Sequence, residues 1–162
     1  MAARDSLAAE PAARLLVMTR VFAAPRRLVF GVWTRPEHLA RWWGPRGFTM
    51  PSHRIDVRPG GAYRFCMRSP DGADHWLQGA YREIVEPERL MFTYAWEDAS
   101  GRPRHETLVT VSLTAEGEAT RLTLRQAVFE STTARDLHQA GWASNLDRLA
   151  EHLMADAPPA AQ

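Results

Sequence analysis

The segment with the most influence on the architecture is residues 131–155, STTARDLHQAGWASNLDRLAEHLMA. Its less polar residues recur every three or four positions, which is the spacing of one face of an α-helix. Ser131, Thr132 or Thr133 can cap the start of this helix. About twenty residues give roughly 30 Å of helix, and such a helix needs a partner surface. The stripe predicted to face that partner comprises Ala134, Leu137, His138, Gly141, Trp142, Asn145, Leu146, Leu149 and Leu153.

Most of the chain before this helix alternates between apolar and polar residues, which is the pattern of half-buried β-strands. Turn signals separate the alternating segments, among them Pro59-Gly60-Gly61, Pro70-Asp71-Gly72 and Glu116-Gly117. Consecutive strands joined by short turns pair antiparallel. The predicted strands cover residues 15–22, 54–57, 63–68, 76–85, 90–97, 107–114 and 122–128.

Two short helices are predicted between the first and second strands. One begins after Ala24-Pro25, because proline suits the first helical position. The other begins at Pro36, and Gly44-Pro45 ends it. Each has apolar residues at helical spacing, namely Val29, Val32 and Trp33 in the first and Leu39, Trp42 and Trp43 in the second.

The predicted order is a strand, two short helices, six strands and a long helix, which indicates the α+β class. We expect a curved antiparallel sheet of about six to seven strands wrapped around the long C-terminal helix. The chain has 162 residues, which favours one domain. We place that domain at residues 14–155 and predict disordered tails at residues 1–13 and 156–162, which are rich in small residues and aperiodic.

Composition excludes several classes of function. The formal net charge is +1, so no basic surface points to nucleic acid or to an acidic membrane. The chain has no lysine, which excludes a lysine Schiff base and a P-loop, and its arginine usage favours a GC-rich bacterial genome. Cys66 is the single cysteine, so no intrachain disulfide can form. No segment is long and apolar enough to span a membrane or to act as a signal peptide, and we expect a cytoplasmic protein.

The alternation also predicts which side chains face the long helix. An apolar space with a few polar groups between sheet and helix is the default binding site in such a fold. The mid-helix Gly141 either lets the helix approach the sheet or leaves room for a ligand. The inner-face residues are Tyr63, Phe65, Leu77, Tyr81, Phe92, Tyr94, Val109, Val111, Leu122 and Leu124. The predicted ligand-binding residues are Trp33, Trp43, Phe48, Tyr63, Phe65, Tyr81, Phe92, Tyr94, His138 and Trp142.

No residue pattern indicates catalysis or a metal site. The histidines do not have the His-Glu-x-x-His spacing of zinc enzymes, and the nucleophile elbow and the dinucleotide glycine pattern are both missing. We therefore assign no catalytic residue, no metal ligand and no cofactor. A buried histidine beside tyrosines could act as a general base, but we expect a neighbouring backbone group to satisfy it instead. The polar candidates for the interior are His53, Asp56, Glu106, Gln126, His138 and Asn145.

Several motifs, taken in order, resemble one known family. They are Leu39–Phe48 (LARWWGPRGF), Arg58–Phe65 (RPGGAYRF), Pro70-Asp71-Gly72 and Gly79–Leu90, followed by Gly141-Trp142 with Leu146–Leu149. Over about residues 15–154 the chain resembles the proteins similar to the activator of heat-shock-protein-ninety ATPase. That family belongs to the START-like, birch-pollen-allergen-like superfamily, so the resemblance implies the helix-grip fold.

The resemblance leaves three functions open. Members of the superfamily bind lipids, hormones and polyketides, which implies a small apolar or aromatic ligand under the long helix. The family name implies instead a stress-response role with a heat-shock chaperone as partner. A cyclase- or hydrolase-type enzyme in the same cavity, with His138 and a tyrosine, is the third alternative. The sequence does not distinguish a monomer from a homodimer.

Overall fold

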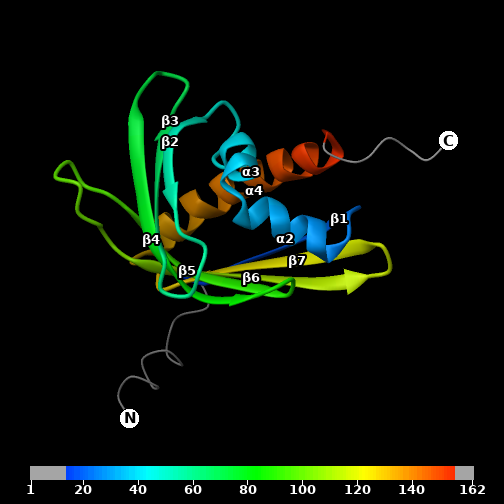
Figure 1. The fold of residues 1–162 in the computed structure, drawn as a ribbon. Helices are drawn as coiled ribbons and strands as arrows, with labels where there is room; N and C mark the ends of the chain where they lie inside the picture. Colours follow the sequence, from blue (N-terminus) through cyan, green and yellow to red (C-terminus); the bar gives the residue numbers. More distant parts are fainter. Residues whose placement is uncertain (1–13, 156–162) are drawn as a thin grey trace, which may run out of the picture.

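A computed structural model of the chain describes residues 14–155, and the two predicted tails lie outside the described residues. One antiparallel sheet curves around a long C-terminal helix, and two short helices lie on the same side of the sheet (Figure 1). The architecture predicted from the sequence is therefore confirmed, including the order of the elements.

Seven strands form the sheet in the order β1-β7-β6-β5-β4-β3-β2, and every neighbouring pair is antiparallel. Strands β1 and β2 are therefore the two edges, although only two short helices separate them in sequence. The strands are β1 (Leu16–Phe22), β2 (Thr49–Ile55), β3 (Ala62–Arg68), β4 (Asp74–Val85), β5 (Arg89–Trp96), β6 (Thr107–Glu116) and β7 (Ala119–Ala127).

The helices are α2 (Arg26–Thr34), α3 (Pro36–Trp42) and α4 (Thr132–Ala155). Of the three proposed caps for α4, Ser131 is the one used, since its Oγ accepts a hydrogen bond of 3.0 Å from the Ala134 backbone N–H. Pro25 lies one position before α2 rather than at its first residue.

The second strand differs most from its prediction, since it begins at Thr49 and ends at Ile55 instead of covering residues 54–57. Pro51 lies inside it and cannot donate a backbone hydrogen bond. Proline is tolerated in edge strands, where one side of the backbone has no neighbour. Because β2 is an edge strand, the segment before residue 54, for which no strand was predicted, is also part of the sheet.

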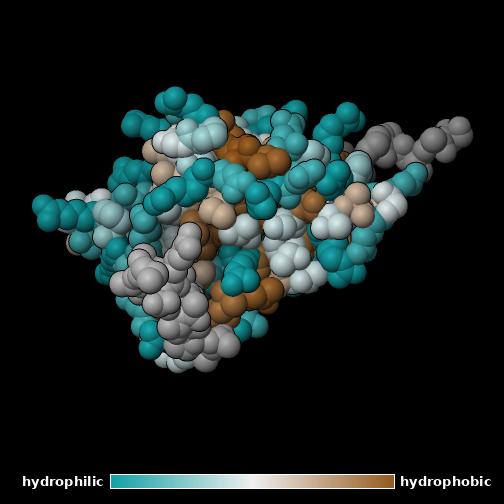
Figure 2. All heavy atoms as spheres, turned by 90° about the horizontal axis from the view of Figure 1, so that it is seen from below, coloured by the Kyte–Doolittle hydropathy of each residue, from teal (hydrophilic) through white to brown (hydrophobic). Residues whose placement is uncertain are grey.

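All ten predicted inner-face residues are buried, and the most exposed of them, Tyr94, is 7% exposed. The predicted stripe of α4 is wrong at Leu137, which is 69% exposed at the start of the helix. The outer face of the sheet shows hydrophilic side chains interspersed with separate hydrophobic areas (Figure 2). In the part of the chain that the structure describes, no helix has the length and apolarity needed to cross a membrane.

Candidate functional site

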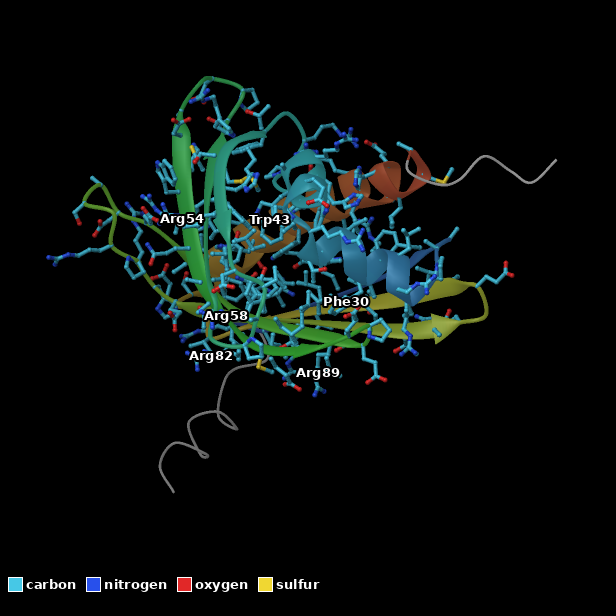
Figure 3. The ribbon with its side chains drawn as sticks, viewed as in Figure 1. Phe30, Trp43, Arg54, Arg58, Arg82 and Arg89 are labelled. Carbon is cyan, nitrogen blue, oxygen red and sulfur yellow. The ribbon has the colours of Figure 1, made fainter. Side chains whose placement is uncertain are left out.

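A cavity of about 320 Å³ lies between α4 and the inner face of the sheet. Its wall is dominated by indole rings and other apolar groups, and its rim reaches the exposed Leu137. The labelled Trp43 lies between the helices and the sheet, whereas Arg54, Arg82 and Arg89 lie outside (Figure 3). The lining residues are Trp43, Gly44, Pro45, Met67, Tyr94, Trp96, Leu137, His138, Gly141, Trp142 and Asn145.

Gly141 keeps α4 open toward the cavity. A Cβ atom at this position would meet only Pro45 Cγ, at 4.0 Å, which is ordinary van der Waals contact. The glycine is therefore not required for close approach of the helix to its neighbours. Of the two roles open from the sequence, the structure favours the one in which the absent side chain leaves space in the cavity.

The loop after α3 forms one wall, and α4 holds it through polar contacts. The Arg148 guanidinium donates to the backbone carbonyls of Trp43, Gly44 and Pro45 at 3.2, 2.9 and 3.2 Å. The Asn145 side-chain oxygen accepts a hydrogen bond of 3.1 Å from the Gly44 backbone N–H. The Pro45 carbonyl also accepts a hydrogen bond of 3.0 Å from the Phe48 backbone N–H. The contacts from α4 give partners to the buried polar groups of Trp43 and Gly44 and so stabilise the wall.

Gly44 is required at its position in this loop for two reasons. Its φ is +96°, in the left-handed region that side chains disfavour. A Cβ atom there would also overlap the Met67 methyl group, which lines the same cavity. Three residues of the Trp-Trp-Gly-Pro motif, Trp43, Gly44 and Pro45, thus form part of the cavity wall.

A chain of buried hydrogen bonds fixes Trp142, the central aromatic residue that α4 contributes to the cavity. Its Nε1–H donates to Gln126 Oε1 at 2.8 Å, and Gln126 Nε2 donates to Thr107 Oγ1 at 2.8 Å. The Thr107 hydroxyl then donates to the Tyr94 carbonyl at 2.9 Å. Because Gln126 is 0% exposed, each of these groups depends on the next for its partner.

His138 has both ring nitrogens engaged. Nδ1 lies 2.7 Å from the Ala134 carbonyl, and Nε2 accepts a hydrogen bond of 3.3 Å from the Trp96 indole. This pairing requires the neutral tautomer with the proton on Nδ1. Burial lowers the pKa of His138, and the Ala134 carbonyl and the charge of Glu130 oppose that effect. His138 is therefore a neutral wall residue without a free basic nitrogen.

We expect the lowered pKa of His138 to make the fold acid-sensitive. Because the histidine binds its proton more weakly when folded, its contribution is complete above the unfolded pKa of about 6.5. It is lost as pH falls from about 6.5 toward the lower folded pKa, by at most about 1.4 kcal/mol per pH unit for one proton. Chemical denaturation between pH 7.5 and 4.5 would measure this loss.

The comparison variant is His138→Gln, which keeps an acceptor for Trp96 but does not titrate. Its free energy of unfolding should fall less steeply below pH 6.5 than that of the wild type. His53→Gln, on the exposed edge strand β2, controls for the loss of an imidazole. Parallel pH profiles for the wild type and His138→Gln would contradict the assignment.

The structure brings four of the ten predicted ligand-binding residues to the cavity: Trp43, Tyr94, His138 and Trp142. Phe48 is half-buried beside this wall, with its ring 6.2 Å from that of His75. The other five pack against one another and against Trp43 around a void of only about 10 Å³. These packed residues, which support the wall from behind, are Trp33, Tyr63, Phe65, Tyr81 and Phe92.

Met67 and Trp96 were not assigned to the site from the sequence, although the alternation along their strands indicates their position. Met67 and Trp96 continue the alternation of Tyr63 and Tyr94, and both line the cavity. Asn145 and Gln126 were polar candidates for the interior, and both are buried, at 5% and 0% exposure. The remaining polar candidates, His53, Asp56 and Glu106, are exposed and lie away from the cavity.

Two other features of the described residues are less suited to be the functional site. A larger hollow of about 690 Å³ lies along α2. Its lining includes the charged residues Arg27, Arg35 and Glu86, which suit an apolar ligand poorly. Among residues 14–155, no three His, Cys, Asp or Glu side chains gather as metal ligands would. The cavity under α4 is therefore the best candidate site.

A seven-stranded curved sheet that grips a long C-terminal helix over an apolar cavity defines a helix-grip protein of the START-like superfamily. The sequence model of the family described as "Activator of Hsp90 ATPase homolog 1-like protein" matches residues 23–154. The chain therefore belongs to this family. No curated protein matched the sequence.

Solved structures of similar proteins share the whole fold. An AHSA1 protein from Silicibacter pomeroyi is 27% identical, with a TM-score of 0.83, over 88% of this chain and 99% of that one. A protein from Nitrosomonas europaea is also 27% identical, with a TM-score of 0.77, over 90% and 97% of the two chains. A protein from Arthrobacter aurescens is 26% identical, with a TM-score of 0.79, over 90% and 88%.

Proposed function

We propose that this protein binds a small apolar or aromatic molecule in the cavity under α4. The observation that carries the proposal is the cavity of about 320 Å³ whose wall includes Trp43, Trp96 and Trp142. Burial of a ligand's apolar surface contributes roughly 25 cal/mol per Å², and indole rings provide large contact areas. The volume is at the low end for ligand pockets, which favours a compact ring compound.

Binding is better supported than catalysis. The cavity has one side chain that commonly acts as a base, His138, and hydrogen bonds occupy both of its nitrogens. Burial also raises the pKa of Tyr94 well above its ordinary value, so its hydroxyl stays protonated at neutral pH. Family membership alone supports the alternative role as an activator of a heat-shock ATPase.

We expect Gly141→Leu to abolish binding by filling the cavity. The new side chain would project from α4 into the space that the glycine leaves open, and we expect at least a tenfold loss of affinity. N-phenyl-1-naphthylamine, a neutral probe that fluoresces in apolar sites, provides the measurement. The wild type should bind it, and its melting temperature should rise with the probe concentration.

The matched control is Gly31→Leu, the same change in α2. A Cβ atom at Gly31 meets only Arg35 Nε, at 4.0 Å, and Gly31 does not line the cavity. This variant should bind the probe like the wild type. Equal binding by wild type and Gly141→Leu would show that the probe sits elsewhere and would remove the support for the proposal.

A further inference from the structure

The polar atoms of the cavity wall restrict what a ligand can be. None of the lining residues is Asp, Glu, Lys or Arg, and the nitrogens of His138 are engaged. The side-chain groups left to meet a ligand's polar atoms are the Asn145 amide, the Tyr94 hydroxyl and the Trp43 indole N–H. The cavity therefore offers hydrogen bonds but no ion pair.

The orientation of the Asn145 amide follows from its neighbour. The Gly44 backbone N–H can only donate, so the Asn145 atom 3.1 Å from it must be the oxygen. The NH₂ group then lies on the other side of the amide plane, and Asn145 is a lining residue. Among the described residues the NH₂ group has no hydrogen-bond acceptor, and Asn145 is 5% exposed overall. The nitrogen is not fully enclosed by protein atoms, so it retains access to the cavity that Asn145 lines.

A donor that opens onto an apolar cavity is complementary to an oxygen atom of the ligand. Once a ligand fills the cavity, leaving the NH₂ group without an acceptor is unfavourable, and a ketone or similar oxygen would satisfy it. A hydrocarbon of the same shape would fill the cavity but leave the donor unpaired. Selection between two such ligands therefore depends on one hydrogen bond.

The charge behind the wall argues against a cation. Indole rings can bind cations through their faces, and three tryptophans line this cavity. However, the Arg148 guanidinium is bonded to the carbonyls of Trp43, Gly44 and Pro45, directly behind the same wall. Arginine stays protonated in proteins, and no lining carboxylate offsets its charge. A neutral ligand with an electron-rich oxygen suits this field better.

We infer that the cavity selects neutral ring compounds that carry a carbonyl oxygen, and that this oxygen accepts a hydrogen bond from Asn145 Nδ2. The inference rests on the proposed function and adds the chemical class of the ligand. Asn145 is thus a specificity-determining residue, while the tryptophans supply the apolar contact.

Fluorenone and fluorene test the inference, because they share one ring system and fluorenone adds the carbonyl group. We expect the wild type to bind fluorenone about tenfold more tightly than fluorene, as measured by tryptophan quenching. In Asn145→Asp, an oxygen is kept for the Gly44 N–H but the NH₂ donor is lost. The preference should then fall to about one, while fluorene binding should change little.

Gln139→Glu controls for the added charge, because Gln139 is also on α4 but does not line the cavity. The carbonyl stretching band of fluorenone gives a second measurement that needs no variant, since a hydrogen-bonded carbonyl absorbs at lower frequency than one in an apolar solvent. Absence of this shift in the bound wild type would overturn the inference even if Asn145→Asp does not fold.

The outcomes separate the two proposals. Equal affinity for fluorenone and fluorene would overturn the role of Asn145 while leaving the proposed function intact. Tighter binding of a naphthyltrimethylammonium ion than of fluorenone would overturn the inferred selection of neutral carbonyl compounds. The cavity would then be a cation-binding aromatic site. Failure of every probe to bind the wild type would overturn both proposals.

Discussion

Gly79→Ala is expected to destabilise the protein by about 3 kcal/mol or more, because no space exists for the added methyl group. A Cβ atom at Gly79 would overlap the backbone carbonyl oxygen of Thr93 on the neighbouring strand. It would also lie 2.6 Å from the Tyr63 hydroxyl oxygen, which donates a hydrogen bond of 2.6 Å to that same carbonyl. Thermal or chemical denaturation would measure the change, and a fall in melting temperature of about 6–12 °C corresponds to it.

The control for Gly79→Ala is Gly31→Ala. In helix α2 the nearest atom to the new methyl group is Arg35 Nε, at 4.0 Å, and alanine is the better helix former. This variant should be as stable as the wild type or more stable by up to about 1 kcal/mol. A similar, small effect of both substitutions would mean that the β4 and β5 backbones separate easily at Gly79.

Gln126→Met is expected to destabilise the fold by about 2–3 kcal/mol, although methionine has nearly the same shape. The change leaves the buried Trp142 Nε1–H without its acceptor and removes the donor to Thr107 Oγ1. An unpaired buried donor is far more unfavourable than the removal of a complete hydrogen-bonded pair. Urea denaturation would give the free energy, and weaker probe binding should accompany it because Trp142 lines the cavity.

A double-mutant cycle with Trp142→Phe isolates this effect. In the Trp142→Phe background no indole N–H remains to be satisfied, so Gln126→Met should be less destabilising there than in the wild type. The expected coupling between the two positions is about 1–2 kcal/mol. Strictly additive losses would mean that the hydrogen bond between Trp142 and Gln126 contributes nothing to stability.

Many parts of the fold could be predicted because their signals are local. A strand with one buried face alternates along its own sequence, as Thr107–Glu116 does, and its inward residues Val109 and Val111 are buried. The long helix is equally readable from the spacing of Leu146, Leu149 and Leu153. These patterns follow from the backbone geometry of each element and require no knowledge of its partners.

The composition of the candidate site was less predictable. Alternation places Tyr63 and Tyr94 on the same inner face, yet Tyr63 is packed among other rings and Tyr94 borders the cavity. The difference depends on where α3 and the loop through Trp43 press against the sheet. That position is determined by contacts between residues about one hundred positions apart, such as Arg148 with the Gly44 carbonyl.

The amino-acid pattern alone was therefore sufficient to predict the order of elements, the inner face of the sheet and the need for a helix to cover that face. These features can be predicted because periodicity shows which residues along one element are buried. The location of the cavity, the neutral state of His138 and the direction of the Asn145 amide required the folded chain. Each depends on hydrogen bonds or on empty volume between elements distant in sequence, such as the Trp96 indole beside His138 and the Gly44 N–H beside Asn145. Interactions of this kind leave no periodic trace in a single sequence.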